Sequence, residues 1–266
     1  MNTVISPAAD RPHSAVGSGV ELFWTLVRTD FKARYHGTVS GFVWALLKPI
    51  SLFVVLMGVF SLVFASDENY KLDLIIGLFL WDFFAEATKT GLTSLHAKGY
   101  LLTKTRCPSW ILVVTSGANA FITLMVFCGV IVMFLTMAGH PPTLPALILF
   151  GAYALALVGI TVGFSLATSV LFLKYRDLNQ VWDVVAQVGF FVAPVIYPLE
   201  IIPETYHRYL FLWPPTAIIE FSRGVLVGPS WPTMTGHLFL LVEVVLVLLA
   251  GALIFRRLSP RAAELL

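Results

Sequence analysis

Residues 144–173 read LPALILFGAYALALVGITVGFSLATSVLFL, and this run contains no charged side chain. An α-helix crosses the hydrocarbon core of a bilayer, about 30 Å thick, with roughly 20 apolar residues. The run is therefore long enough to cross a membrane and to tilt or extend past it. Stretches of the same kind elsewhere in the chain decide the fold class.

Five further apolar stretches complete the pattern of a polytopic membrane protein. The stretch 181–196 is the shortest and meets Pro194 and Pro198, which indicates that its end is not a regular helix. We expect an all-α integral membrane protein with six transmembrane helices. The six expected spans are 42–64, 72–95, 110–137, 144–173, 181–196 and 237–255, within a transmembrane domain of residues 42–255.

Composition excludes soluble, disordered and disulfide-stapled classes of protein. The 266 residues are 58% hydrophobic and 12% charged, with a mean hydropathy of +0.86, whereas soluble proteins carry about 25% charged residues. Two cysteines cannot form a disulfide framework, and a net charge of +2 gives no argument for nucleic acid. Residues 1–20 lack the apolar core of a signal peptide and are expected to form a flexible cytoplasmic N-terminus.

The basic residues predict the orientation of the chain. With the N-terminus inside, three of the 17 Lys and Arg residues, Lys71, Arg208 and Arg223, fall in outer segments, and the other 14 fall in or near cytoplasmic segments. This asymmetry is the positive-inside pattern. Both termini are therefore expected in the cytoplasm, with residues 256–266 as a cytoplasmic tail.

Two basic cytoplasmic features lie outside the expected spans. In residues 21–36, apolar side chains recur at helical spacing with cations elsewhere on the wheel, which predicts an amphipathic helix in the membrane interface. The second feature is the loop 96–109, which is short and basic. We expect both to dock a cytoplasmic partner, with a plain anchor and a plain connector as the alternatives. The expected docking cations are Arg28, Lys32, Arg34, Lys98, Lys104 and Arg106.

The outer segment 194–232 contains seven prolines, with apolar stretches 206–213 and 217–227 between them. Each stretch is too short to span a bilayer and predicts a short helix that re-enters or lies on the outer leaflet. Irregular backbone at that depth is tolerated only beside protein or a water-filled cavity. This indicates an outer gate, with a plain interfacial lid as the alternative. The expected gate residues are Pro194, Pro198, Tyr206, Tyr209 and Trp213.

Charged residues inside the expected spans are few. Asp82, Glu86 and Lys89 share one face of the second span, where Glu86 and Lys89 can pair. A charge near the bilayer centre costs about 2.5–3.5 kcal/mol on insertion scales, so these side chains should face protein or water. In the fourth span, small residues such as Gly159 and Gly163 recur at intervals of about four and predict close helix packing within the subunit.

Aromatic residues make up 14% of the chain and form stripes in the first and fifth spans. We interpret these stripes as the lining of a substrate pathway, with packing against lipid or core as the alternative. The expected pathway residues are Phe53, Phe60, Trp182, Gln187, Phe190, Phe191 and Tyr197.

Catalytic and nucleotide-binding motifs are absent from the sequence. No glycine is followed directly by lysine, so the chain has no P-loop. Neither a His/Cys cluster with metal-ligand spacing nor a Gly-x-Ser-x-Gly elbow occurs. We therefore expect a chain that is not an enzyme and holds no cofactor or metal of its own.

Several short motifs follow one another in a defined order. They are LVRTDFKARY at 26–35, GFVWALLKP at 41–49, RDL at 176–178, APVIYP at 193–198 and WPPT at 213–216. In order and spacing they resemble the membrane subunit of ABC-2 type exporters, over about residues 21–255. Ala193 and Trp213 stand where that family usually has Ser and Asn.

The resemblance implies a half-transporter. Two copies would form the pore, and two copies of a separate ATPase, which holds ATP and Mg, would bind at the cytoplasmic side. The architecture is similar to inner-membrane exporters of lipid-linked polysaccharides of the O-antigen, capsule or teichoic acid type. An exporter of drugs or other small lipophilic substrates is the first alternative. A secondary transporter or channel is the second, although no convincing internal repeat of the kind common in that class is present.

Overall fold

The computed structural model describes residues 19–35, 41–64, 69–104, 108–228 and 230–264, and all elements in these ranges are helical. Residues 1–18, which make up most of the predicted flexible N-terminus, lie outside the described ranges. The elements are α1 (Gly19–Tyr35), α2 (Gly41–Val63), α3 (Tyr70–Ala97), α4 (Gly99–Lys104), α5 (Ser109–Ser116), α6 (Ala118–Met137), α7 (Leu144–Lys174), α8 (Leu178–Val192), the 3₁₀ helix η1 (Leu199–Ile201), α9 (Glu204–Leu210), α10 (Pro214–Leu226), α11 (Met234–Leu258) and the 3₁₀ helix η2 (Ser259–Glu264).

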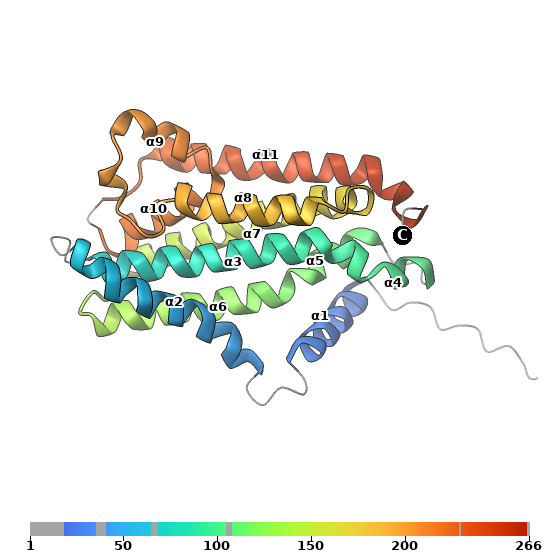
Figure 1. Cartoon of the computed structure of the whole chain (residues 1–266), viewed down its shortest axis with the longest axis horizontal. Coiled ribbons are helices and arrows are strands. Elements are labelled where there is room, and N and C mark those ends of the chain that lie inside the picture. The colour runs from blue at the N-terminus through green and yellow to red at the C-terminus, as the bar shows by residue number, and fades with distance from the viewer. Residues whose placement is uncertain (1–18, 36–40, 65–68, 105–107, 229, 265–266) are drawn as a thin grey trace, which may run out of the picture.

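The long helices run side by side as one bundle (Figure 1). Helix α7 packs on α3 and α11, and α3 also contacts α2, α6 and α8. Helices α1 and α4 and the C-terminal end lie at one end of the bundle, whereas α9 and α10 lie at the opposite end. The amphipathic helix expected at 21–36 is thus present as α1, and the two short outer helices are present as α9 and α10.

Each of the six predicted spans falls largely on helix, but the helices are not equally suited to a membrane. Four stretches, 43–63, 109–137, 144–174 and 234–258, are long and apolar enough to cross it. Helix α3 has 28 residues and carries several charges, while α8 has 15 residues, fewer than the roughly 20 that a span needs. Helix α8 ends at Val192, so the last four residues of the predicted stretch 181–196 are not α-helical, as its prolines indicated.

Helix α3 forms the centre of the bundle because its apolar residues occur all around the helix. Leu74, Ile76 and Leu80 are fully buried, and Phe79 stacks against Phe127 of α6 with 4.7 Å between ring centroids. A helix buried in this way is held by its neighbours, so it tolerates more polar residues than a lipid-facing helix.

Helices α7 and α11 approach each other through glycine, as the small residues of the fourth span predicted. A Cβ atom on Gly251 would lie 2.0 Å from the carbonyl oxygen of Gly163, and a Cβ on Gly163 would lie 2.7 Å from the carbonyl oxygen of Val247. No side chain fits between these backbones. The prediction of close packing within the subunit is confirmed.

Candidate functional site

Helix α8 separates its residues into a buried stripe and an exposed face. Trp182 and Gly189 are buried, whereas Asp183, Gln187 and Phe191 are exposed and follow one another at intervals of four residues. This spacing places the three side chains on one helical face. The predicted pathway residues Gln187 and Phe191 therefore lie on an open surface of the subunit.

The buried stripe of α8 belongs to an aromatic cluster. The ring of Trp182 lies 4.1 Å from that of Phe164 in α7, and its Nε1 donates a hydrogen bond of 3.1 Å to Thr88 Oγ1 in α3. Trp213 packs over Gly189, where an added Cβ would lie 2.6 Å from the indole. Trp182 and Trp213 are 6.5 Å apart between centroids. The predicted pathway and gate residues thus meet, but inside the subunit.

The remaining predicted pathway residues are partly or fully enclosed. Phe53 is buried against Phe134 of α6, with 5.5 Å between ring centroids. Phe60, Phe190 and Tyr197 are half-buried. The pathway role of these residues stays a prediction, and for Phe53 and Trp182 the structure shows packing between helices. Phe53 and Trp182 point into the subunit because of the rotation of their helices about the helix axis. The spacing of aromatic residues in the sequence does not determine that rotation.

Two ion pairs lie on the side of the bundle formed by α2, α3 and α8. Lys48 Nζ of α2 is 3.0 Å from Asp82 Oδ1 of α3, and Lys89 Nζ of α3 is 2.5 Å from Asp183 Oδ1 of α8. The sequence did not predict this link between Lys89 and α8. The Lys48 side chain is 77% exposed, and those of the second pair are about half exposed at 50% and 46%.

The backbone between α8 and η1 is not helical, and carbonyl groups in it and in the last turn of α8 accept side-chain hydrogen bonds. The hydroxyl of Tyr197 donates to the carbonyls of Phe191 and Val192 at 3.0 and 3.2 Å. The hydroxyl of Tyr70 in α3 donates to the Ile196 carbonyl at 2.8 Å. These contacts satisfy acceptors in the last turn of α8 and in the chain break that follows it.

Arg223 of α10 is a further donor to carbonyls of this chain break. From the sequence alone, Arg223 was counted only as an outer charge. Its Nη1 donates to the Pro194 carbonyl at 2.6 Å, its Nη2 to the Val195 carbonyl at 3.0 Å, and its Nε to the Asp73 carbonyl at 3.0 Å. The side chain is 8% exposed. The sequence did contain a signal for this buried role. Arg223 lies inside the apolar stretch 217–227 and follows Glu220 by three residues, as in a buried ion pair.

That acid is Glu220, whose Oε1 accepts a hydrogen bond of 2.8 Å from Arg223 Nη1. Burial raises the pKa of the Glu220 carboxyl above its ordinary value, although the charge and hydrogen bond of Arg223 lower it. Both residues line an outer cavity of about 580 Å³, together with Asp73, Glu200 and Phe64. The outer segment is therefore fixed by one buried arginine beside a polar cavity.

The other predicted gate residues fall into two groups. Pro194 is buried and Pro198 is half-buried, both in the break after α8. Tyr206 and Tyr209 of α9 are each 57% exposed. Exposed amphipathic rings of this kind are typical of a membrane–water interface.

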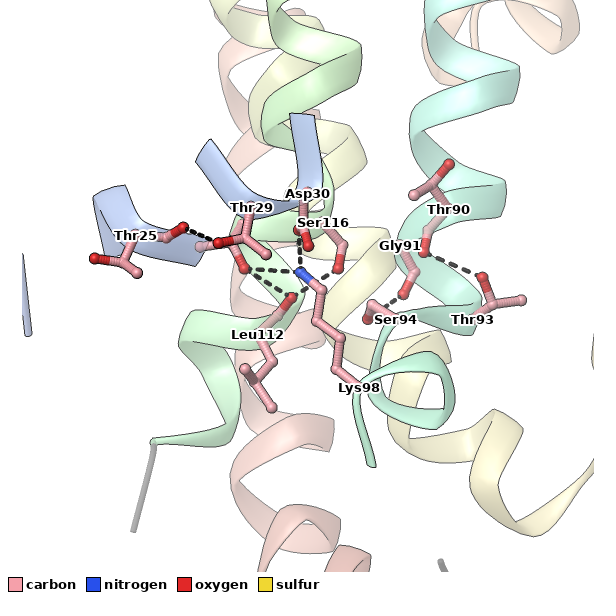
Figure 2. Close-up of polar contacts among 11 residues, drawn as sticks. Thr25, Thr29, Asp30, Thr90, Gly91, Thr93, Ser94, Lys98, Leu112 and Ser116 are labelled. Carbon is pink, nitrogen blue, oxygen red and sulfur yellow. Dashed lines mark hydrogen bonds and ion pairs between the residues drawn. The ribbon is translucent and has the colours of Figure 1, made fainter. Parts of the chain in front are cut away.

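At the opposite end of the bundle, Lys98 follows α3 and reaches into a polar junction (Figure 2). Its Nζ forms an ion pair with Asp30 of α1 and a hydrogen bond of 3.1 Å with Thr115 Oγ1 of α5. The Lys98 side chain is 12% exposed. It therefore ties α1 to the bundle and is not presented at the surface.

The other predicted docking cations differ in position. Arg28 and Lys32 of α1 are exposed. Arg34 lies in α1 and Lys104 in α4, whereas Arg106 falls outside the described residues. Docking on these cations stays a prediction, and the exposed pair in α1 is its best-placed part.

Comparison with known proteins places these features in a family. The model of the ABC-2 type transporter family matches residues 21–227, which is more than half of the chain. The chain belongs to the ABC-2 type transporter family. This match runs from α1 through the end of α10, so it includes the exposed face of α8, the Arg223 cluster and the Lys98 junction.

Relatives of this ABC-2 family member align over about three quarters of its length or more. It is 28% identical to the O-antigen export system permease protein RfbA of Klebsiella pneumoniae, over 92% of this chain and 95% of the relative. The RfbA protein of Myxococcus xanthus is 27% identical over 91% and 94%. The polysialic acid transport protein KpsM of Escherichia coli is 20% identical over 74% and 78%.

Proposed function

We propose that the chain is the membrane-spanning permease subunit of an ATP-driven exporter of a lipid-linked polysaccharide. The substrate class is O-antigen, capsule or teichoic acid, and the membrane is the cytoplasmic membrane of a bacterium. The observation that carries this proposal is the agreement of two differently named groups of relatives, one exporting O-antigen and one transporting polysialic acid. Polysaccharide is the substrate class that these names share.

The proposed topology has six spans, with α3 and α8 as the two beyond the four apolar ones. Helix α3 is supported in this role because Asp82 and Lys89 are paired to neighbouring helices, which lowers the cost of charge at membrane depth. Helix α8 is short, but Tyr197, Arg223 and Tyr70 donate hydrogen bonds to carbonyls at its end and in the break after it. Such satisfaction is the condition for irregular backbone inside a bilayer.

In this topology α1 and η2 are both cytoplasmic, and α9 and α10 form the outer gate. An even number of spans requires the two ends of the domain to lie on one side, in agreement with their common place in Figure 1. Helix α10 has 13 residues, too few to span, and is proposed to re-enter the outer leaflet.

Two copies of the chain are proposed to face each other across the surface formed by α2, α3 and α8. Half-exposed charges at membrane depth are too costly against lipid, so this surface should meet water or another chain. Gln187 and Phe191 lie on the exposed face of α8 and are retained as pathway residues. Asp183 and Lys89 are added to the proposed pathway residues, because they lie on the same side of the bundle, formed by α2, α3 and α8.

The energy source is proposed to be a separate ATPase, two copies of which hold ATP and Mg and dock on α1. The exposed cations Arg28 and Lys32 are the proposed contacts. Lys98 would not contact the ATPase itself. It would transmit the effect of docking, because it joins α1 to α5 and to the end of α3.

The test is deletion of the gene in its source bacterium, followed by complementation. We expect loss of surface polysaccharide, accumulation of lipid-linked glycan inside the cell, and recovery of both with the wild-type gene. Unchanged surface polysaccharide together with increased sensitivity to lipophilic drugs would favour the drug-exporter alternative. Export that persists without any ATPase partner would favour a secondary transporter.

A further inference from the structure

A groove at the cytoplasmic end of the bundle takes no part in the proposed transport mechanism. It has a volume of about 610 Å³ and lies between α5, α7 and the end of α11. This volume is within the range of about 300–1,000 Å³ that is typical of small-molecule pockets. The groove shares no lining residue with the exposed face of α8 or with the cavity beside Arg223.

The lining of this groove is polar at one end and apolar at the other. Ser109 begins α5 and Ser259 follows α11, and their hydroxyl oxygens are 3.3 Å apart. Arg256 lines the same end and is exposed. Leu166 lies eight residues before the end of α7, or about 12 Å deeper along the helix axis. Val114 and Ala252 complete the deeper, apolar part.

The charge of the lining is also one-sided. Arg256 is its only charged residue among the described residues, and the exposed Arg257 follows it at the end of α11. Within the described ranges, no ion pair within 4.0 Å joins Arg256 to an acidic residue. The groove therefore suits a ligand with an anionic end and an apolar body.

Trp110 indicates where the ligand comes from. Its side chain is 52% exposed and lines the groove next to Ser109. Tryptophan is enriched at the level of lipid headgroups, and basic pockets between transmembrane helices on the cytoplasmic side bind anionic headgroups. A phospholipid of the inner leaflet is the one abundant molecule at this depth with this polarity.

We propose that this groove binds one anionic phospholipid, with its phosphate at Arg256 and the two serines and an acyl chain along Val114, Leu166 and Ala252. The lipid would fill the space between α5 and α11, which the described residues leave open. This site is separate from the polysaccharide pathway, so its failure and that of the proposed function are distinguishable.

The test measures lipid binding to the full chain, purified in detergent together with its ATPase. The probe is phosphatidylglycerol with brominated acyl chains, which quenches nearby tryptophan fluorescence. We expect saturable quenching, most of which is lost in Trp110→Phe. Arg256→Gln should weaken binding about 10-fold, the size of one lost charge-assisted hydrogen bond. Arg257→Gln is the matched control and should leave binding within a factor of about two.

Two comparison probes identify the ligand. Brominated phosphatidylcholine shares the acyl chains without net charge, and glycerol phosphate shares the anion without chains. Equal binding of phosphatidylcholine would overturn the proposal, and so would displacement of phosphatidylglycerol by equimolar glycerol phosphate. A second variant, Ala252→Phe, fills the apolar end and should abolish quenching with Arg256 intact. If it fails to fold, Arg256→Gln decides alone, and equal effects of the two arginine variants would refute the site.

Discussion

Replacing Arg223 by methionine is expected to release the outer segment from the bundle. The substitution keeps a long apolar side chain but removes four hydrogen bonds, three of them to the carbonyls of Pro194, Val195 and Asp73. A buried acceptor left without a partner costs about 1–3 kcal/mol. Because the neighbouring cavity of about 580 Å³ admits water to part of this site, we take the lower value for each carbonyl.

The carbonyls of Pro194 and Val195 lie outside any helix and lose this donor, whereas the carbonyl of Asp73 is also a helical acceptor within α3. Two carbonyls at about 1 kcal/mol each give a loss of about 2 kcal/mol, or roughly a 30-fold shift toward the open segment. Hydrogen exchange of the peptide 190–200 measures this shift directly. The matched control is Arg208→Met, which removes the same charge from α9, where Arg208 lies over the Tyr209 ring at 5.1 Å. Equal exchange rates in wild type and Arg223→Met would refute the assignment of Arg223 as the residue that fixes this segment.

The same variant has an expected pH dependence. Burial raises the pKa of Glu220, and Arg223 opposes that shift, so removing Arg223 raises the pKa further. A raised pKa of an acid means that its stabilising contribution is present below the unfolded value of about 4.3 and is lost as the pH rises through the folded value. The exchange defect of Arg223→Met should therefore be smaller in acid than at neutral pH. A defect that grows in acid would contradict this account of Glu220.

Three further predictions concern other parts of the chain. Lys98→Met should loosen α1 and reduce the coupling of ATP hydrolysis to export without preventing folding. Lys32→Met should instead weaken ATPase binding and leave α1 attached to the bundle. Crosslinking of α1 to the bundle and ATPase assays distinguish the two variants. Gly163→Ala should destabilise the chain by about 1–3 kcal/mol, because a Cβ meets backbone at 2.7 Å. Gly151→Ala, where a Cβ meets nothing within 4 Å, should leave Tm unchanged or raise it. Asp183→Asn should alter Tm little, because half-exposed pairs contribute about 0–1 kcal/mol, but should slow polysaccharide export.

The helices themselves were predictable because apolar runs and prolines act locally. The uncharged run 144–173 became α7 with a difference of one residue at its end, and the prolines after 193 marked the end of α8. The short outer helices were also visible, since α9 and α10 lie between prolines. Local sequence determines such elements because both the hydrophobic period and the missing N–H of proline are properties of a few neighbouring residues.

The rotation of each helix was not predictable from the same patterns. Trp182 and Phe191 are both large aromatic residues of α8, yet one is buried and the other is 61% exposed. Trp182 is buried against Phe164 of α7 and Thr88 of α3, and Gly189 on the same stripe admits the ring of Trp213. A contact between residues that far apart in sequence leaves no local signal. The pairing of Lys89 with Asp183 was missed for the same reason.

Stability does not explain the ion pairs on the side formed by α2, α3 and α8. Lys48 and the pair Lys89–Asp183 are at least about half exposed, and exposed pairs of this kind contribute about 0–1 kcal/mol. Each charge would cost more than this against lipid. An apolar bundle that needed only to fold and insert would be more stable with leucine at these positions. Their presence is accounted for when this surface faces water, and a polysaccharide with many hydroxyl groups requires a wetted path. The exposed charges of α3 and α8 therefore support the proposed pathway surface more directly than the aromatic stripes do.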